Sequence, residues 1–150
     1  GYWTHASLYL GSVEERSPYI TTELEKIIPD SINIIEAISS GVVFAHLDKS
    51  TDADAIAVLR PYVSSNELAN AMECAIGQMN KPYDYDFDCD TDSRIYCTEL
   101  IYKSYQPHTE MPTFSLFGRN YITADELYNY TVQNDSPDYS LKVVFMSVGE

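Results

Sequence analysis

The chain has 150 residues, of which 45% are hydrophobic and 13% aromatic. This much apolar surface excludes an intrinsically disordered chain and suffices for one core, so we expect a single domain over residues 1–150. The chain carries 9 basic and 23 acidic residues, which gives a formal net charge of −14. Nucleic acids and anionic membranes bind basic patches, so this charge argues against either partner.

The ends of the chain and its cysteines also bear on function. No apolar run approaches the roughly 20 residues that a membrane-spanning helix needs. The first residue is Gly1 rather than Met, which indicates a processed or trimmed chain and favours the bacterial cell envelope or secretion. Three cysteines are too few for a disulfide framework, and their odd number leaves at least one free thiol, which can act as a nucleophile.

The N-terminal part is predicted to be mainly β-structure. Alternation over residues 2–10 indicates a strand. One face of this strand carries Ala6, Leu8 and Leu10, and the other face carries Trp3, His5, Ser7 and Tyr9. Residues 32–38 and 42–47 are β-rich and flank a Ser-Ser-Gly turn, which predicts a hairpin. A further strand is expected at 55–59.

Four segments of the chain are predicted to be helices. Three of them begin with a capping-box pattern, in which a Thr or Ser is followed three residues later by Glu. The four segments are the one from Thr22 to Pro29, residues 65–79, residues 96–105 and the segment after Thr123. The helix over 65–79 has one apolar stripe. Residues 106–122 are expected to be irregular, with a last strand at 141–148. Because strands gather early and helices late, the pattern favours an α+β fold.

Three residues could form a nucleophile, its base and the group that orients the base. His5 lies on a strand, where a lone histidine is more often a surface residue, but histidine is the commonest general base near neutral pH. Glu36 lies in an apolar run, so it either faces solvent from an edge strand or accepts a hydrogen bond, for example from a histidine. Cys97 at a helix start is either a small core residue or a thiol activated by the helix N-terminus.

Four segments resemble NlpC-type cysteine peptidases and their relatives. They are Thr4–Gly11, where a His opens a strand that ends in Gly, Ile35–Ala37, the Pro-Tyr segment Lys81–Tyr85, and the nucleophile helix Tyr96–Tyr102. The order His, Glu, Cys is similar to that of the circularly permuted papain-like amidases of the YiiX/YebB-like branch. Lecithin–retinol acyltransferase-like proteins share this order. The resemblance spans roughly residues 3–105.

This resemblance implies a circularly permuted papain-like α+β fold with an antiparallel sheet packed against helices. It implies that Cys97 is the nucleophile, His5 the general base and then acid, and Glu36 its orienter, in hydrolysis of an amide through an acyl-enzyme. The substrate would be a peptide, a cell-wall fragment or another small acyl amide, without cofactor or metal. We expect contacts to substrate from Tyr83, Trp3 and Tyr96. The alternatives are a lipid acyltransferase or thioesterase of the same type and a non-catalytic binding module.

An acidic loop offers a different interpretation, because five aspartates occupy every second position from 84 to 92. From Asp88 to Glu99 the spacing matches an EF-hand calcium loop, although Ser93 replaces the glycine that the sharp turn needs. The loop is therefore either a calcium site or a solvated acidic segment. We also expect its carboxylates to raise the pKa of Cys97, against the helix N-terminus and His5, which lower it. If the loop lies over the cleft, it would favour cationic or amine-bearing substrates.

Overall fold

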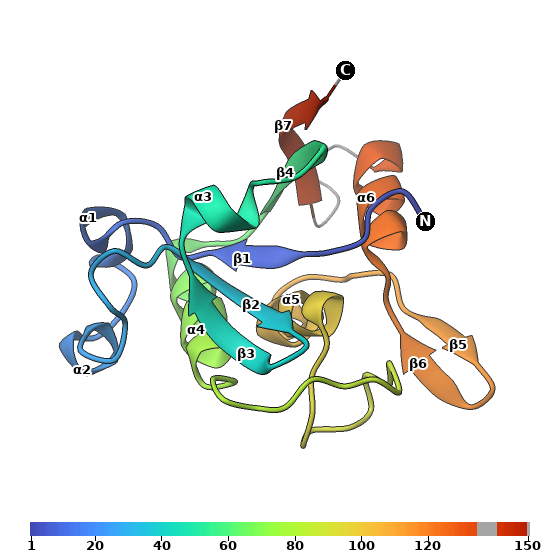
Figure 1. Cartoon of the computed structure of the whole chain (residues 1–150), viewed down its shortest axis with the longest axis horizontal. Helices are drawn as coiled ribbons and strands as arrows, with labels where there is room; N and C mark the ends of the chain where they lie inside the picture. The colour runs from blue at the N-terminus through green and yellow to red at the C-terminus, as the bar shows by residue number, and fades with distance from the viewer. Residues whose placement is uncertain (135–140, 150) are drawn as a thin grey trace.

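The computed structural model describes residues 1–134 and 141–149, in which strands form three antiparallel sheets, β1-β2-β3, β4-β7 and β5-β6 (Figure 1). The elements in chain order are β1 (Ser7–Tyr9), α1 (Val13–Arg16), α2 (Thr22–Glu25), β2 (Ile34–Ile38), β3 (Gly41–Ala45), α3 (Leu47–Ser50), β4 (Ala55–Pro61), α4 (Ser65–Ile76), α5 (Cys97–Tyr105), β5 (Phe114–Leu116), β6 (Arg119–Tyr121), α6 (Ala124–Gln133) and β7 (Leu141–Val148).

The predicted hairpin forms the middle and one edge of the three-stranded sheet. β2 and β3 pair from Ile34 opposite Ala45 to Ile38 opposite Gly41, so Ser39 and Ser40 make the turn. Gly41 has a φ of +110°, and a Cβ there would lie 2.5 Å from the Lys81 carbonyl oxygen, so only glycine fits. β1 joins the other side of β2, with Ser7 opposite Glu36. β1 is shorter than predicted, because residues 2–6 run outside the sheet.

The two central helices, α4 and α5, lie behind this sheet in Figure 1. α4 begins at the predicted capping box of Ser64 and Glu67 and buries the predicted stripe, but it ends at Gly77. α5 packs against β1, β2 and α4, and it is buried on more than its apolar face. Glu99 and Ser104, both polar, are at most 1% exposed. The apolar pattern of α5 therefore understated how much of the helix is enclosed.

The segment over 106–122, expected to be irregular, instead holds the β5–β6 hairpin. Its turn residues Phe117 and Gly118 have φ of +52° and +77°, the left-handed backbone of a tight two-residue hairpin turn. The earliest helices also differ from expectation. Ser12 and Glu15 form a capping box for α1, which the sequence analysis missed, and α2 is capped by Thr21 rather than Thr22.

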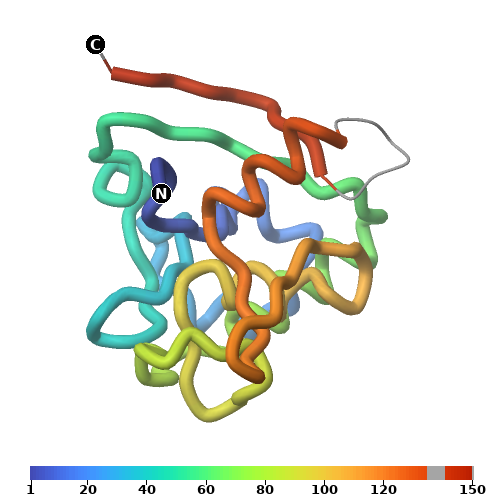
Figure 2. The backbone as a smooth tube through the Cα atoms, turned by 90° about the vertical axis from the view of Figure 1, so that its right-hand side faces the viewer, coloured from blue at the N-terminus to red at the C-terminus, as the bar shows by residue number. Residues whose placement is uncertain are grey.

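β4 and β7 bring together segments that are far apart in the sequence. Figure 2 shows these two strands running side by side along one edge of the molecule, with Ala55 opposite Val148 and Pro61 opposite Leu141. The expected strands at 55–59 and 141–148 are thus confirmed, and they pack against α6. In the described residues, every helix is too short or too polar to cross a bilayer.

A fully buried arginine fastens the loop that joins β1 to β2. The Arg16 guanidinium is 0% exposed and pairs with the Glu25 carboxylate at 2.7 Å. Its Nη1 donates to the carbonyl oxygens of Gly11, at 2.8 Å, and of Ile32, at 2.7 Å. One side chain therefore ties the end of β1, α2 and the approach to β2 together.

We expect Arg16→Ala to lower the free energy of unfolding by about 3 kcal/mol, because Glu25 and two carbonyl groups lose their buried partner. Urea unfolding followed by circular dichroism measures this change. Lys26→Ala is the control: Lys26 pairs with Glu23 on the surface at 2.9 Å, and such exposed pairs contribute little. Equal destabilisation by both substitutions would contradict the role given to Arg16.

Candidate active site

The site is built around a short hydrogen bond between His5 and Glu36. Ser7 faces Glu36 across the β1–β2 pair, and His5 precedes Ser7 by two residues along the chain. The Nε2 atom of His5 lies 2.7 Å from Oε2 of Glu36, whose side chain is 11% exposed. The hydrogen bond from His5 lowers the pKa of Glu36, so this buried carboxylate stays ionised. It also leaves Nδ1 of His5 free to face another group.

Cys97 is the group that faces His5. It is the first residue of α5 and is 8% exposed. Burial raises the pKa of its thiol, but the hydrogen bond with His5, the backbone N–H of Ala6 and the charge of His5 together lower that pKa below its ordinary value. Hydrogen bonds to Cys97 and then to Glu36 raise the pKa of His5 to about 9, against the effect of burial. These shifts favour a thiolate beside an imidazolium.

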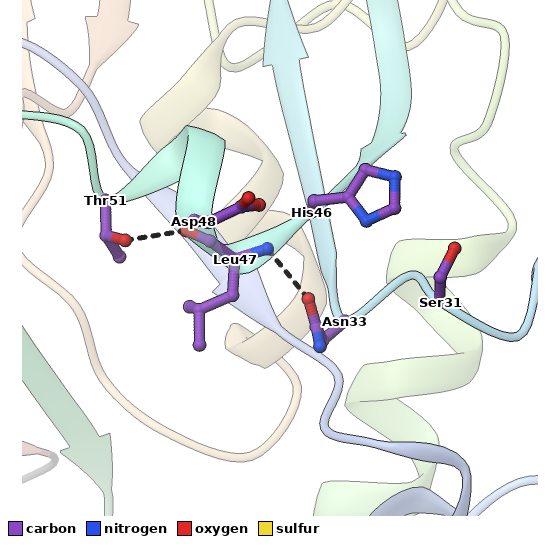
Figure 3. A pocket seen from close by; sticks show the side chains of 6 residues that line it. All are labelled: Ser31, Asn33, His46, Leu47, Asp48 and Thr51. Carbon is purple, nitrogen blue, oxygen red and sulfur yellow. Dashed lines mark hydrogen bonds between the residues drawn. The ribbon is translucent and has the colours of Figure 1, made fainter.

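The second oxygen of Glu36 has its own partner. The Ser50 hydroxyl donates to Oε1 of Glu36 at 3.2 Å from the end of α3. Figure 3 shows two bonds that fasten α3: the Leu47 N–H donates to the Asn33 side chain at 2.8 Å, and the Thr51 hydroxyl donates to the Leu47 carbonyl oxygen at 2.7 Å. Ser50 is thereby held against Glu36. Nothing in the sequence pattern pointed to Ser50.

The hollow shown in Figure 3 is not part of this arrangement. It is lined by Ser31, Asn33, His46, Leu47, Asp48 and Thr51. None of its lining residues is His5, Glu36 or Cys97, so we assign it no catalytic role.

Tyr83 lies beside the Cys97 thiol. Burial raises the pKa of Tyr83 to about 12, as do the charge of Cys97 and the hydrogen bond to it. The phenol is therefore protonated at neutral pH and can donate to the sulfur or to an oxygen bound next to it. Of the three predicted substrate contacts, Tyr83 is the one that lies beside the Cys97 thiol.

Tyr96 and Trp3 have other surroundings. Tyr96 is 2% exposed, and its hydroxyl accepts the Ile122 N–H at 2.9 Å. The Thr98 hydroxyl donates to the Ile122 carbonyl oxygen at 2.6 Å. The start of α5 is therefore anchored to Ile122 on both sides of Cys97. Such burial argues against the predicted contact between Tyr96 and substrate. The Trp3 ring packs on Tyr128 of α6 at 4.8 Å, which holds the segment that carries His5.

The aspartates of the loop over 84–92 are directed at separate partners rather than at one point. Asp86 pairs with Arg94 at 2.9 Å, Asp90 accepts from the Asn120 side chain at 2.9 Å, and Asp92 pairs with Lys103 at 2.7 Å. Among the described residues, no three His, Cys, Asp or Glu side chains gather as metal ligands would.

Glu99, the last residue of the EF-hand spacing, has hydrogen-bond and ion-pair partners at α5 itself. It accepts the Tyr96 N–H at 3.0 Å and lies 3.1 Å from Lys103. The EF-hand interpretation is therefore wrong in its geometry. The pKa of Cys97 is lowered overall, and its main causes are burial, His5 and backbone N–H groups, with no aspartate of this loop among them.

The sequence matches one family model, that of the permuted papain-like amidase enzymes of the YaeF/YiiX, C92 family, over residues 1–140. No curated protein and no solved structure matches the chain. The matched residues run from the segment that carries His5 through α6, so they include His5, Glu36 and Cys97. This match confirms the permuted papain-like α+β fold expected from the sequence.

The geometry predicts that Glu36 sets the reactivity of Cys97. In Glu36→Gln, His5 loses its negative partner, so its pKa falls and the pKa of Cys97 rises. We expect the pH at which Cys97 is half-maximally alkylated by iodoacetamide to rise by about one unit. Mass spectrometry assigns the modified cysteine, because burial raises the pKa of Cys89 to about 11 and separates its reaction from that of Cys97. Glu23→Gln, on the exposed face of α2, is the control. An unchanged profile in Glu36→Gln would contradict the coupling.

Proposed function

We propose that this chain, which belongs to the permuted papain-like amidase family, cleaves an amide bond with Cys97 as nucleophile, His5 as base and acid, and Glu36 as the group that orients His5. Family membership makes the chain a hydrolase of the amidase type. The observation that carries the finer assignment is the position of His5, which is bonded to Glu36 at 2.7 Å and whose interaction with Cys97 lowers the pKa of that thiol. A nucleophile, its base and an orienting carboxylate in contact are what acyl transfer requires.

In the first step the Cys97 thiolate attacks the carbonyl carbon of the amide. A carbon–sulfur bond forms, and the carbonyl π electrons move to the oxygen. The N–H groups at the start of α5 have no acceptor within the helix, so they point toward this site and can stabilise the oxyanion. The protonated Tyr83 hydroxyl, which lies beside the sulfur, supports this step as a further donor.

The second half of the reaction depends on the proton held by His5. The imidazolium donates its proton to the nitrogen of the leaving amine as the carbon–nitrogen bond breaks, which leaves a thioester on Cys97. Neutral His5 then removes a proton from water, and the hydroxide attacks the thioester. The carboxylic acid departs, and the thiolate and imidazolium are regenerated. Glu36 holds the Nε2 atom of His5 in a hydrogen bond, so the other ring nitrogen faces Cys97 in every step.

Hydrolysis of a panel of acyl aminocoumarin amides tests this assignment. We expect Cys97→Ala to abolish turnover and Cys74→Ala, which removes a thiol of α4, to leave it unchanged. The rate should rise with pH as Cys97 ionises and fall above pH of about 9, because His5, whose pKa is raised to about 9, then lacks the proton for the leaving amine. Turnover that survives in Cys97→Ala would contradict the role of this thiol.

Ser50 should act as a positioning residue for this reaction. Ser50→Ala removes the hydroxyl bonded to Oε1 of Glu36, so the carboxylate loses one of the two contacts that fix it. We expect kcat to fall about threefold to tenfold, the acidic limb of the pH profile to move upward, and KM to change little. Ser50→Thr should restore most of the rate, since it keeps the hydroxyl.

The matched control is Ser31→Ala, which removes a hydroxyl from the hollow of Figure 3, whose lining does not include Ser50 or Glu36. Equal losses in Ser50→Ala and Ser31→Ala would mean that the effect is one of general stability and not of the Glu36 contact.

A further inference from the structure

Four helices in the described part of the chain begin with the same contact, in which a glutamate at the third helical position accepts the backbone N–H of the residue before the helix. At α1, α4 and α6 this hydrogen bond lies at the surface. At α5 it is buried: Oε2 of Glu99 accepts the Tyr96 N–H at 3.0 Å, and Glu99 is 0% exposed. Burying a carboxylate is costly, so helix capping alone, which a surface carboxylate provides elsewhere, does not account for Glu99. The other three glutamates are Glu15, Glu67 and Glu126.

The residue before α5 also differs from its counterparts. Before α1, α4 and α6 stands a Ser or Thr whose hydroxyl accepts the N–H of the same glutamate, at 3.2 or 3.3 Å. Before α5 stands Tyr96, which makes no side-chain capping bond, because its hydroxyl accepts the Ile122 N–H and lies 3.0 Å from the Cys89 sulfur. The first N–H groups of α5 are therefore left for the reacting group, and the Thr98 N–H already helps to lower the pKa of Cys97.

A buried ion pair holds Glu99 in place. Its Oε1 lies 3.1 Å from Nζ of Lys103, one turn further along α5, and the Lys103 side chain is only 13% exposed. The same Nζ donates to the Thr91 carbonyl oxygen and lies 2.7 Å from Asp92, so Lys103 also ties the segment before α5 to the helix. Burial raises the pKa of Glu99 to about 7, whereas the Tyr96 N–H and Lys103 favour the charged carboxylate.

The contact with Glu99 restrains the backbone next to the nucleophile. Tyr96 has a φ of −105° and a ψ of 175°. Both of its backbone groups are engaged, since its N–H donates to Glu99 and its carbonyl oxygen accepts the Leu100 N–H at 3.0 Å. These two angles set the plane of the peptide between Tyr96 and Cys97, and with it the direction of the Cys97 N–H. An N–H group stabilises an oxyanion only when it is aimed at the place where the charge develops.

We propose that Glu99 is a positioning residue for the reaction at Cys97: by holding the Tyr96 N–H, it keeps the Cys97 N–H aimed at the oxyanion that forms when the thiolate attacks a carbonyl group. This inference rests on the proposed function for the identity of the nucleophile, but it concerns the backbone that carries that nucleophile. The charge of the carboxylate strengthens the hydrogen bond, and the ion pair with Lys103 fixes its direction. A side chain of the same length should replace Glu99 only if it keeps the acceptor.

Two reactions of Cys97 in the full chain separate this role from a general effect on the thiol. In acetylation by p-nitrophenyl acetate the thiolate adds to the carbonyl carbon, an oxyanion forms, and its collapse expels p-nitrophenolate and leaves a thioester. In alkylation by iodoacetamide the thiolate displaces iodide at a saturated carbon, and no oxyanion forms. Each rate constant is corrected for the reaction of Cys97→Ala. The ratio of acetylation to alkylation then reports stabilisation of the oxyanion at Cys97.

Glu99→Met and Glu99→Gln isolate the acceptor, because both side chains are uncharged and similar in length. We expect the ratio to fall about tenfold in Glu99→Met, which is less than the loss of a whole oxyanion donor costs, since the Cys97 N–H is misdirected rather than removed. Glu99→Gln should keep the ratio within about twofold of the unchanged chain, because the neutral hydrogen bond is weaker but still made. If Glu99→Met does not fold, Glu99→Asp gives the same test, since its shorter side chain withdraws the oxygen from Tyr96.

Glu67→Met is the matched control. Glu67 makes the same contact at the start of α4, where it accepts the Ser64 N–H at 2.7 Å at the surface. Its loss should weaken the cap of α4 and leave the ratio of acetylation to alkylation unchanged.

An unchanged ratio in Glu99→Met, equal losses in Glu99→Met and Glu99→Gln, or an equal loss in Glu67→Met would overturn the role of Glu99. The proposed function fails separately: a ratio that depends on Glu99 together with no turnover of any amide in the panel would leave the positioning role standing and contradict the hydrolase mechanism. Amide turnover by Cys97 with a ratio that does not respond to Glu99→Met would contradict the positioning role alone.

Discussion

The hydrogen bond between His5 and Glu36 is the interaction on which the site depends. It requires the register of β1 on β2 that sets Ser7 opposite Glu36, since a shift of β1 by one residue would put the side chains of Ser7 and Glu36 on opposite faces of the sheet. The neighbouring contacts serve the same arrangement. Trp3 holds the segment before His5 on α6, Ser50 holds the far oxygen of Glu36, and Ile122 anchors the start of α5 where Cys97 lies.

The composition suggests that the acidic residues before α5 control the pKa of Cys97, but the structure gives several of these residues other partners. In the loop over 84–92, Asp84, Asp86 and Asp92 pair with Arg94, Arg119 and Lys103. Asp84 also holds the loop backbone, because it accepts the Asp86 N–H. The pKa of Cys97 is governed instead by burial, by His5 and by backbone N–H groups.

The sequence predicted much of this architecture where the signal was local. The β2–β3 hairpin, the capping box of α4 and the start of α5 follow from turn residues, caps and periodicity, and family resemblance singled out His5, Glu36 and Cys97. The β5–β6 hairpin was missed because Phe117 adopts a left-handed turn conformation that its side chain disfavours. Ser50 and the anchoring of Tyr96 could not be foreseen, because each depends on a partner distant in the sequence.

The central claim is that Cys97 and His5 form a thiolate–imidazolium pair, and an NMR titration of the His5 ring tests it most directly. Chemical shifts of the imidazole carbons can be followed from pH 5 to 11, with His46 and His108 as references within the same chain. The account predicts a pKa for His5 of about 9 in the unchanged chain and a clearly lower pKa in Cys97→Ala, since the bond to Cys97 is the largest cause of the rise. The same His5 pKa in both chains would contradict it.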